Sequence, residues 1–473
     1  YLIFSLLRAV YNLTLHPAAK FPGPKLRGAF YFPTYWEVWT GDIVFNWHRM
    51  HEKYGPFVRI SPHWISIIHP DAWRDIYGQT ATKKLIPKDP EIYFTMGNDH
   101  IADIADHTRI RRLMSHAFSE QALRSQDSII NLYIDLLIQR LQEKAASNAP
   151  VDLVRWLNYT TFDITGDLCF GESFGALENQ EDHPWVANIF KGLKFARMFR
   201  VLRAYPLIGL PILSLLKMFP ALAKARQKHE QFSIDKTMRR LEMKTDRKDF
   251  MSYILKHNDE KGMTTAEIMK TMSIVIIAGS ETSATLLSGA IFYLLKNPEW
   301  MSKLQEEIRI TFRDESEMTF AALSQLKIMN AIIQETFRMY PSVPTTLPRL
   351  TTKQGAVISN TYIPPNCSVG VAQYPAYRSS RNFTDPDTYA PERFLGDPKY
   401  QNDNLSVIQP FSVGPRNCLG QGLAYAEIRT ILARLIWHFE MELEESSADW
   451  ADQKVYILWD KQPLMVKLKL RSG

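Results

Sequence analysis

The sequence predicts a mainly α-helical protein, with a large helical bundle beside a smaller β-rich region. Stretches with helical periodicity fill most of the chain. Strand-like stretches are short and lie at residues 57–70, 356–374 and 455–470. Because strands near both ends flank a long helical middle, we expect the strands to form a small sheet beside the bundle.

The chain is long enough for more than one domain, yet nothing in it separates two. Its 473 residues, 45% of them hydrophobic, suffice for a large core. Length alone would allow about two or three domains. No Gly/Ser-rich or Pro-rich linker, repeat or low-complexity tract divides the sequence. We therefore expect residues 21–473 to form a single domain.

Charge and cysteine content argue against two other classes of protein. The net charge is +6 and the basic residues are scattered, whereas nucleic-acid-binding proteins concentrate them in a stripe. Cys169, Cys367 and Cys418 are the three cysteines and lie far apart. They show neither a disulfide framework nor the spacing of a zinc site, which fits a reducing compartment.

Residues 1–20 have two readings. They are apolar for about seven residues before Arg8, whereas a bilayer span needs about 20. The segment is either an ordinary amphipathic helix or, as we expect, the end of a membrane anchor. Pro22 and Pro24 restrict the backbone that follows, which predicts a stiff, extended hinge.

The most regular helix is predicted from Thr264 to Lys296. Thr264 and Glu267 have the spacing of a capping box. A helix of about 32 residues is about 48 Å long and would cross the whole body. It is apolar nearly all round, as expected for a buried helix.

Polar and small residues interrupt the middle of this helix, at Ala278, Gly279, Ser280, Glu281 and Thr282. Glycine costs about 1 kcal/mol inside a helix, and a buried glutamate is unfavourable unless it is paired or protonated. The interruption is either a packing notch with a satisfied glutamate or part of a functional site.

Cys418 lies in the loop "FSVGPRNCLG", directly before a predicted helix. A helix N-terminus favours an anionic sulfur. Gly414 and Gly420 allow the backbone to approach a flat ligand, Arg416 offers a fork for a carboxylate, and Phe411 supplies an apolar wall.

Three chemistries compete for this loop. A cysteine nucleophile would need a histidine base, and zinc would need more cysteines; the loop contains neither. A thiolate beside an arginine and two glycines suits haem, with sulfur bound to iron and Arg416 bound to a propionate. The alternative is a structural cysteine in a glycine turn.

The loop resembles the haem-ligand signature F-x-x-G-x-R-x-C-x-G of the cytochrome P450 family. Phe411, Gly414, Arg416, Cys418 and Gly420 all match it. "AGSETS", "ETFR" and "APERF" resemble three further motifs in the family's order, and the resemblance spans about residues 20–470. It implies haem b between the long central helix and the cysteine loop.

The other motifs imply roles by resemblance. Glu335 and Arg338 of "ETFR", with Arg393 of "APERF", resemble a buried Glu–Arg–Arg network that holds the cysteine loop. In "AGSETS", Ala278 and Gly279 resemble the O₂-binding notch. Glu281 and Thr282 resemble the acid–alcohol pair that manages protons. Arg111 and Arg349 resemble propionate partners, and His107 stands near Arg111 where many members have tryptophan.

The resemblance implies a haem-thiolate monooxygenase. Electrons would come from NADPH through the flavins of a membrane-bound NADPH–cytochrome P450 reductase, with cytochrome b5 as a further donor. A basic patch including Arg109, Arg112 and Arg124 is a candidate docking site. The protein would be a monomer on the cytosolic face of the endoplasmic reticulum membrane.

Several stretches are similar to filamentous-fungal members that hydroxylate or epoxidise terpenoids, polyketides, alkaloids or cyclic dipeptides. The expected pocket walls are residues 92–101, 195–216, 274–278, 343–347 and 458–459. The same motifs allow oxidative C–C or C–N coupling or ring rearrangement. A haem-thiolate isomerase or dehydratase without external O₂, or a non-catalytic haem protein, is disfavoured because Glu281 and Thr282 are present.

Overall fold

The computed structural model describes residues 2–79, 85–93, 104–181, 197–217, 220–243, 245–259 and 262–471. The α-helices are α1 (Leu2–Thr14), α2 (Lys25–Ala29), α3 (Phe32–Thr40), α4 (Ile43–Tyr54), α5 (Ala72–Tyr77), α6 (Pro90–Tyr93), α8 (Ile104–Ala117), α9 (Glu120–Ala145), α10 (Leu153–Phe170), α11 (Ala176–Asn179), α13 (Pro206–Lys217), α14 (Pro220–Glu242), α15 (Phe250–His257), α16 (Thr265–Lys296), α17 (Pro298–Thr311), α18 (Phe320–Leu323), α19 (Lys327–Met339), α20 (Gln373–Tyr377) and α21 (Gln421–His438).

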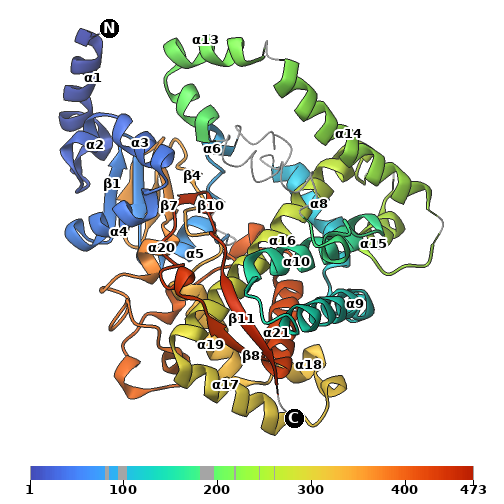
Figure 1. Cartoon of the computed structure of the whole chain (residues 1–473). Helices are drawn as coiled ribbons and strands as arrows, with labels where there is room; N and C mark the ends of the chain where they lie inside the picture. Colours follow the sequence, from blue (N-terminus) through green and yellow to red (C-terminus); the bar gives the residue numbers. More distant parts are fainter. Residues whose placement is uncertain are drawn as a thin grey trace.

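The strands are β1 (Phe57–Ser61), β2 (Trp64–Ile67), β3 (Val151–Asp152), β4 (Arg349–Leu350), β5 (Ala356–Ile358), β6 (Thr361–Ile363), β7 (Ser368–Val371), β8 (Phe439–Leu443), β9 (Val455–Tyr456), β10 (Leu458–Trp459) and β11 (Met465–Leu470). Two short 3₁₀ turns matter for the site, η4 (Pro391–Phe394) and η7 (Gly414–Arg416). The predicted fold class, a large helical bundle with a smaller β-rich region, is confirmed (Figure 1).

The strands form four small sheets instead of the single one expected. The largest has the order β1-β2-β7-β4, in which β2 pairs with β7 in parallel and the other pairs are antiparallel. A second sheet has the order β3-β11-β8. The stretch "VYILW", read from the sequence as one strand, is a hairpin of β9 and β10 that turns at Ile457, whose φ is +85°. Positive φ in a β-branched residue is strained, so periodicity alone could not reveal this turn.

Helix α16 is the centre of the bundle (Figure 1). It begins with the predicted capping box, since the Thr264 side chain accepts from the Glu267 N–H and the Glu267 side chain accepts from the Thr264 N–H. Helices α10, α19 and α21 pack against it. Among the described residues, α16 is the helix long and apolar enough to cross a membrane, but 67% of its apolar window is buried inside the protein. It is therefore a core helix, as predicted.

The predicted hinge is docked on the body. The Arg59 N–H donates to the Pro22 carbonyl at 2.8 Å, and a Cβ at Gly23 would lie 2.4 Å from the Arg59 carbonyl oxygen. The Arg59 guanidinium also donates to the Asn12 carbonyl of α1 at 2.8 Å. Residues 12–24 are thus fastened to β1, which fixes where α1 leaves the body.

Candidate functional site

The cysteine loop is a tight turn between η7 and α21. The Cys418 N–H donates to the Phe411 carbonyl at 2.8 Å, and α21 begins three residues later at Gln421. Gly414 has φ +79°, and a Cβ there would lie 2.1 Å from the Tyr77 carbonyl oxygen. The turn therefore requires glycine at position 414 and presents Cys418 at the start of a helix, as predicted.

A cavity of about 340 Å³ lies between this loop and α16. Its walls are mostly apolar, and it joins Cys418 on one side to Thr282 on the other. The predicted site residues that line it are Ala278, Gly279, Thr282, Phe411, Arg416, Cys418 and Gly420. Residues far apart in the sequence thus meet around one space that can hold a ligand.

The environment of the Cys418 thiol differs from the expectation of an anionic sulfur. Burial raises its pKa above the usual value, although the Gly420 backbone and Arg111 act in the opposite direction. Burial therefore outweighs the helix terminus. A metal that binds this sulfur displaces its proton, so a cationic metal can stabilise the thiolate where the helix alone does not.

A set of basic residues lies at one edge of the site. We call Lys88, His107, Arg111, Arg349 and Arg416 the basic cluster. Burial, followed by the charges of Arg416 and Arg349, lowers the pKa of Lys88 to about 8. Burial, followed by Arg416 and Arg111, lowers the pKa of His107 to about 4, so His107 is neutral at pH 7. The charged groups that shift these two pKa values are all basic, which favours binding of an anion.

The hydrogen-bond donors of Arg349 are the most informative feature of this cluster. It is only 3% exposed, yet its Nε and Nη1 have no hydrogen-bond partner among the described residues. Its guanidinium lies over the Tyr77 ring, 5.4 Å from the centroid. Buried donors without acceptors are costly, so Arg349 is suited to a ligand carboxylate.

The other members of the cluster are placed differently. Arg111 donates through Nη1 and Nη2 to the carbonyl and side-chain oxygens of Asn417, at 2.7 and 2.6 Å. It thereby holds the residue next to Cys418. Sequence reasoning missed Lys88, which an antiparallel bridge places opposite Arg349. No motif marks this lysine, because only the chain's return to the sheet brings the two together.

The polar centre of α16 divides into two faces. The Thr282 hydroxyl donates to the Ala278 carbonyl at 2.6 Å, and Thr282 borders the cavity. The Glu281 side chain is 2% exposed, and its Oε1 lies 2.8 Å from Lys461 Nζ. Lys461 also donates to the Thr285 hydroxyl at 2.9 Å. The expected acid–alcohol pair is therefore split, with the alcohol in the cavity and the acid in a buried ion pair.

Gly279 lines the cavity but also serves packing. A Cβ at this position would lie 3.1 Å from the Thr165 side chain of α10. Helix α10 makes the most extensive contact with α16 among the described elements. The packing notch thus describes Gly279, while Ala278 and Thr282 line the ligand space. Glu281 is only partly satisfied, because its Oε1 pairs with Lys461 but its Oε2 has no hydrogen-bond partner among the described residues.

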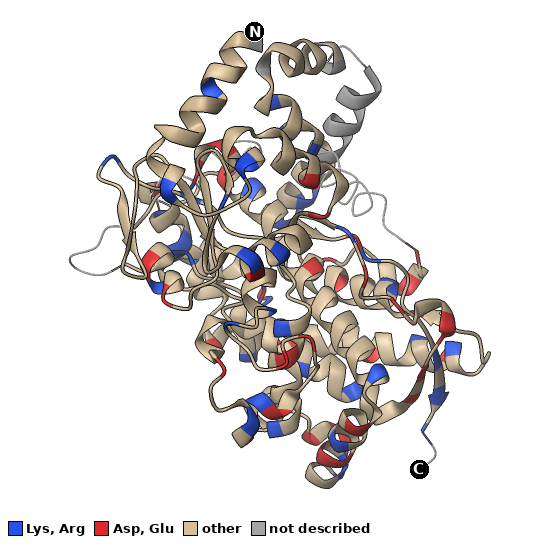
Figure 2. Ribbon diagram, turned by 90° about the vertical axis from the view of Figure 1, so that its left-hand side faces the viewer, with Lys and Arg blue, Asp and Glu red and all other residues tan. Residues whose placement is uncertain are grey.

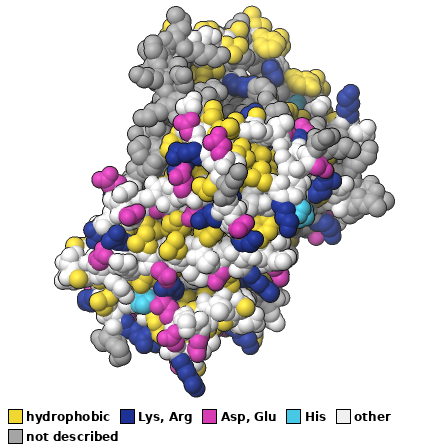
Figure 3. All heavy atoms as spheres, turned by 90° about the vertical axis from the view of Figure 1, so that its right-hand side faces the viewer, with side chains coloured by type: hydrophobic (Ala, Val, Ile, Leu, Met, Phe, Trp, Pro, Cys, Tyr) yellow, Lys and Arg dark blue, Asp and Glu magenta, His cyan; other side chains and the backbone are white. Residues whose placement is uncertain are grey.

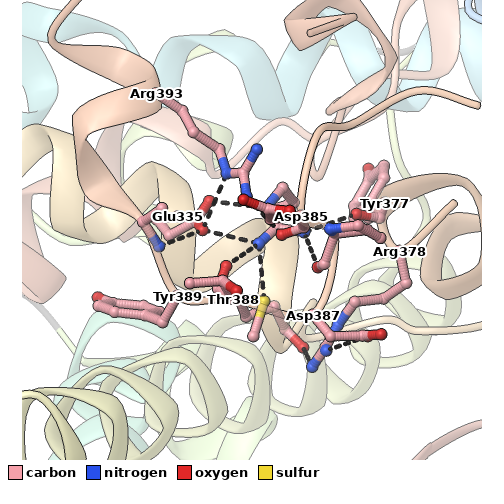
Figure 4. Close-up of polar contacts among 12 residues, drawn as sticks. Glu335, Tyr377, Arg378, Asp385, Asp387, Thr388, Tyr389 and Arg393 are labelled. Atoms are coloured by element: carbon pink, nitrogen blue, oxygen red, sulfur yellow. Dashed lines mark hydrogen bonds and ion pairs between the residues drawn. The ribbon is translucent and has the colours of Figure 1, made fainter. Parts of the chain in front are cut away.

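The predicted Glu–Arg–Arg residues lie together, and Figure 4 shows the contact of Glu335 with Arg393. Glu335 Oε1 is 2.7 Å from Arg338 Nη2 and 3.4 Å from Arg393 Nε, and all three side chains are 0% exposed. Arg393 also pairs with Asp403 at 2.5 Å, a member that the motifs did not indicate. Arg338 donates to the carbonyls of Tyr377 and Thr388 at 3.0 and 2.7 Å.

The network reaches the cysteine loop through α19. Phe337, between Glu335 and Arg338, packs edge-on against Phe411 with ring centroids 5.3 Å apart. Because Phe411 also accepts the hydrogen bond from Cys418, the position of α19 sets the position of the thiol.

A thiol that lines an apolar cavity at the start of a helix, beside a cluster of basic residues, is the arrangement expected of a haem-thiolate protein. The chain belongs to the cytochrome P450 family, whose model matches residues 22–468. It is 44% identical to the cytochrome P450 monooxygenase astJ of Aspergillus oryzae, over 99% of this chain and 95% of that protein.

Two further relatives are named as a monooxygenase and a hydroxylase. The chain is 43% identical to the cytochrome P450 monooxygenase astA of Talaromyces wortmannii, over 98% of this chain and 94% of that protein. It is 40% identical to an averantin hydroxylase of Dothistroma septosporum, over 100% of this chain and 90% of that protein. The protein is thus an oxidoreductase of the monooxygenase type, with haem b as cofactor and NADPH as electron source through a reductase.

The residues present fit haem. Gly420 has φ −85°, and a Cβ there would meet only the Phe118 ring, at 3.6 Å. Neither backbone conformation nor protein packing requires glycine at this position, so its use leaves room for a flat ligand in the cavity. The Arg349 donors that lack a partner within the described part of the chain provide the second observation, since they suit a propionate.

Arg349→Met is expected to weaken retention of haem. A hydrogen bond to a charged group is worth about 1.5–3 kcal/mol, so haem should leave about ten to a hundred times faster. Transfer of haem to apomyoglobin measures this rate. Arg124→Met is the matched control because Arg124 is 81% exposed. An unchanged rate in Arg349→Met would show that this arginine does not hold the cofactor.

Proposed function

We propose that Cys418 is the iron ligand and that the protein hydroxylates or epoxidises an apolar fungal secondary metabolite. The observation that carries this proposal is the shared cavity of Cys418 and Thr282. Because one ligand space touches both a thiol and a helix hydroxyl, a substrate held there lies between the metal-binding sulfur and a proton-handling group.

Haem with a thiolate ligand supplies the activation of O₂. Residues of this chain supply cofactor binding and a proton-handling hydroxyl. Arg349 and Arg416 would hold the propionates of the cofactor and so orient it. The Ser342 hydroxyl donates to the Thr282 carbonyl at 2.8 Å, which fastens the loop after α19 to the middle of α16. The Thr282 hydroxyl can then present a proton to the cavity by releasing its bond to Ala278.

The substrate class follows from the walls of the cavity. Val275, Ala278, Val343 and Leu347 line it and exclude water. This set supports the predicted walls at residues 274–278 and 343–347. An apolar molecule such as a terpenoid or polyketide suits these walls, and the fungal relatives support a secondary metabolite.

The other predicted walls of the cavity lack this support. Residues 94–101 and 195–196 lie outside the described residues. Trp459 is not among the residues that line the cavity, and it stacks on Tyr340 with ring centroids 4.4 Å apart. Its indole N–H donates to the Pro341 carbonyl at 2.8 Å. Trp459 is therefore part of the aromatic packing of the core, which sequence spacing does not reveal.

Exposed apolar side chains support attachment to the cytosolic face of the endoplasmic reticulum membrane. Helices α1, α3 and α13 lie at the same end of the molecule (Figure 1), and hydrophobic side chains also gather along the upper edge in Figure 3. Aromatic and aliphatic side chains of this kind favour a bilayer interface. The exposed set includes Phe4, Leu6, Leu7, Trp36, Trp39, Leu207, Ile208 and Leu215.

A membrane-bound reductase is the proposed electron donor. Of its candidate docking residues, Arg112 and Arg124 are exposed. Arg109 pairs with Asp106 and Glu267 at 2.9 and 2.5 Å, so it holds α8 to the start of α16 instead. Figure 2, which views the molecule from the left-hand side of Figure 1, shows basic and acidic residues interspersed among the described residues and no basic stripe there.

Three measurements test the proposed function. Reduced protein under carbon monoxide is expected to show the thiolate-type spectrum. Titration with terpenoids, polyketides, indoles and cyclic dipeptides should give a saturable low-spin to high-spin shift with one class. That compound should then be oxidised only when reductase, NADPH and O₂ are all present. Conversion without NADPH or O₂ would point to an isomerase or dehydratase.

A further inference from the structure

A buried tyrosine at the end of α20 contacts the chain where it enters the cysteine loop. Tyr377 is 0% exposed and is one of the largest fully buried side chains among the described residues. Its hydroxyl accepts a hydrogen bond from the Gln409 N–H at 2.9 Å. Gln409 is followed by Pro410 and Phe411, the first residue of the loop. This bond therefore fixes the point at which the backbone turns into the loop.

Two backbone hydrogen bonds connect Gln409 with the residue that carries the thiol. The Gln409 carbonyl accepts from the Ser412 N–H at 2.9 Å, which closes a turn over Pro410 and Phe411. The Phe411 carbonyl accepts from the Cys418 N–H at 2.8 Å. Ser412 has φ +58°, a conformation that persists only where the surrounding structure holds it. A shift of Gln409 is thus expected to move Phe411 and, with it, Cys418.

The backbone of Tyr377 is fixed to the buried Glu–Arg–Arg network. Arg338 donates to the Tyr377 carbonyl at 3.0 Å. The next residue, Arg378, donates to the Met339 carbonyl at 3.0 Å. The end of α20 is therefore fastened to the end of α19, so that Tyr377 contacts the network through its backbone and the loop through its hydroxyl.

The hydrogen of the Tyr377 hydroxyl has a defined acceptor. The hydroxyl donates to Gln373 Oε1, one helical turn earlier on α20, at 3.3 Å. A tyrosine hydroxyl has one hydrogen to donate, so this bond leaves its oxygen lone pairs for the Gln409 N–H. Burial raises the pKa of Tyr377 well above its usual value, although the Gln409 backbone acts in the opposite direction. The hydroxyl therefore keeps its hydrogen and its orientation.

Gln373 extends this set of hydrogen bonds to the wall of the cavity. It is 2% exposed and lines the cavity, as do Ser342 and Val343. Its N–H donates to the Thr345 carbonyl at 3.3 Å, within the predicted wall at residues 343–347. One hydrogen-bonded unit thus contacts the ligand space on one side and the entry of the cysteine loop on the other.

We propose that Tyr377 is a positioning residue for the thiol, and that Gln373 orients its hydroxyl from the cavity wall. Tyr377 holds the entry of the loop, and thereby Cys418, in the place where the sulfur can bind iron. None of the four sequence motifs includes Tyr377 or Gln373. This inference rests on the proposed role of Cys418 as the iron ligand.

The first test follows the lifetime of thiolate ligation in Tyr377→Phe. The variant keeps the aromatic ring but leaves the Gln409 N–H without its acceptor. Haem-loaded protein is reduced under carbon monoxide, and the thiolate-type spectrum is recorded over time. This spectrum should decay about tenfold faster than in wild type, because loss of the acceptor of a buried donor is large enough for such a change. Total haem should stay constant over the same period.

Tyr374→Phe is the matched control. Tyr374 lies on the same helix and makes its contacts through the ring, with Trp459 at 6.0 Å between centroids and with the Arg378 guanidinium at 5.5 Å. Loss of its hydroxyl should leave the decay at the wild-type rate. Equal decay rates in Tyr377→Phe, Tyr374→Phe and wild type would overturn the proposal.

The reduction potential of the iron separates positioning from general stability. A displaced thiolate donates less electron density to iron, so the potential should rise in Tyr377→Phe. Gln373→Leu should shift the potential in the same direction, because the Tyr377 hydroxyl then lacks its acceptor. The double variant should match Tyr377→Phe alone, since two residues that act through one contact are not additive. Additive shifts would show that Gln373 does not act through Tyr377.

The outcomes distinguish this proposal from the proposed function. If wild type gives no thiolate-type spectrum, the assignment of Cys418 and the proposed function fail. If wild type gives it and Tyr377→Phe keeps both the decay rate and the potential, the function stands and the role of Tyr377 fails. A lower unfolding temperature with an unchanged potential would indicate a structural role and would also overturn the inference.

Gln373→Leu keeps the proposal testable if Tyr377→Phe yields no haem-loaded protein. This variant leaves Tyr377 and Gln409 in place and removes only the acceptor of the hydroxyl hydrogen. Faster decay of the thiolate-type spectrum together with a raised potential would support the proposal, and wild-type values of both would overturn it.

Discussion

Cys418→Ser is expected to abolish substrate oxidation and the thiolate-type carbon monoxide spectrum. A serine hydroxyl cannot provide the electron donation by which a thiolate favours O–O cleavage. The loop should keep its shape, because the turn depends on Gly414 and on the backbone hydrogen bond to Phe411. The measurements are the reduced carbon monoxide spectrum and product formation with reductase and NADPH.

Cys367→Ala is the control for this variant. Cys367 is buried beside β7 and does not line the cavity, so its loss should leave the thiolate spectrum unchanged. If Cys418→Ser retained that spectrum while Cys367→Ala lost it, the assignment of the ligand would be wrong.

Glu335→Gln is expected to have the largest effect on folding and haem loading. It would leave Arg338 and Arg393 buried together without a carboxylate between them. Removing one partner of a buried ion pair costs about 3–5 kcal/mol, a large share of the roughly 5–15 kcal/mol that stabilises a protein domain. Arg338 would keep its carbonyl acceptors, but its charge would lack compensation.

The expected result is a low yield of haem-loaded protein and a lower unfolding temperature. Movement of α19 should also disturb the loop, since Phe337 packs on Phe411. Glu442→Gln is the control, because Glu442 is 65% exposed and lies 3.8 Å from Lys469, and surface pairs contribute about 0–1 kcal/mol. Equal stability of the two variants would contradict a structural role for Glu335.

Much of the fold follows from local patterns. The ends of α16 were predictable because a capping box and an Asn-Pro pair mark them, and β1, β2 and β11 because apolar residues are concentrated there. The β9–β10 hairpin was not predictable, because its turn consists of Ile457, a residue type that favours strands. The docking of the hinge on β1 depends on Arg59, which no local signal connects with Asn12 or Pro22.

The residues of the candidate site also include some that local patterns predict and some that they do not. Cys418, Arg416, Glu335 and Thr282 stand in dense motifs, whose order along the chain identifies the family. The sequence also contains Lys88, Glu427 and Lys461, but each looks like an ordinary charged residue on a helix or loop. Nothing in their neighbours along the chain distinguishes them from surface residues.

The sequence by itself determined the haem-thiolate chemistry, the central helix and the family, because closely spaced residues encode them. Only the tertiary structure decided the surroundings of the two buried acids, Glu281 and Glu427. Glu281 lies 2.8 Å from Lys461, whereas the carboxyl oxygens of Glu427 have no hydrogen-bond partner among the described residues, and burial raises the pKa of both groups. The charge of a buried group depends on the residues that face it from other elements, and those contacts exist only in the folded chain.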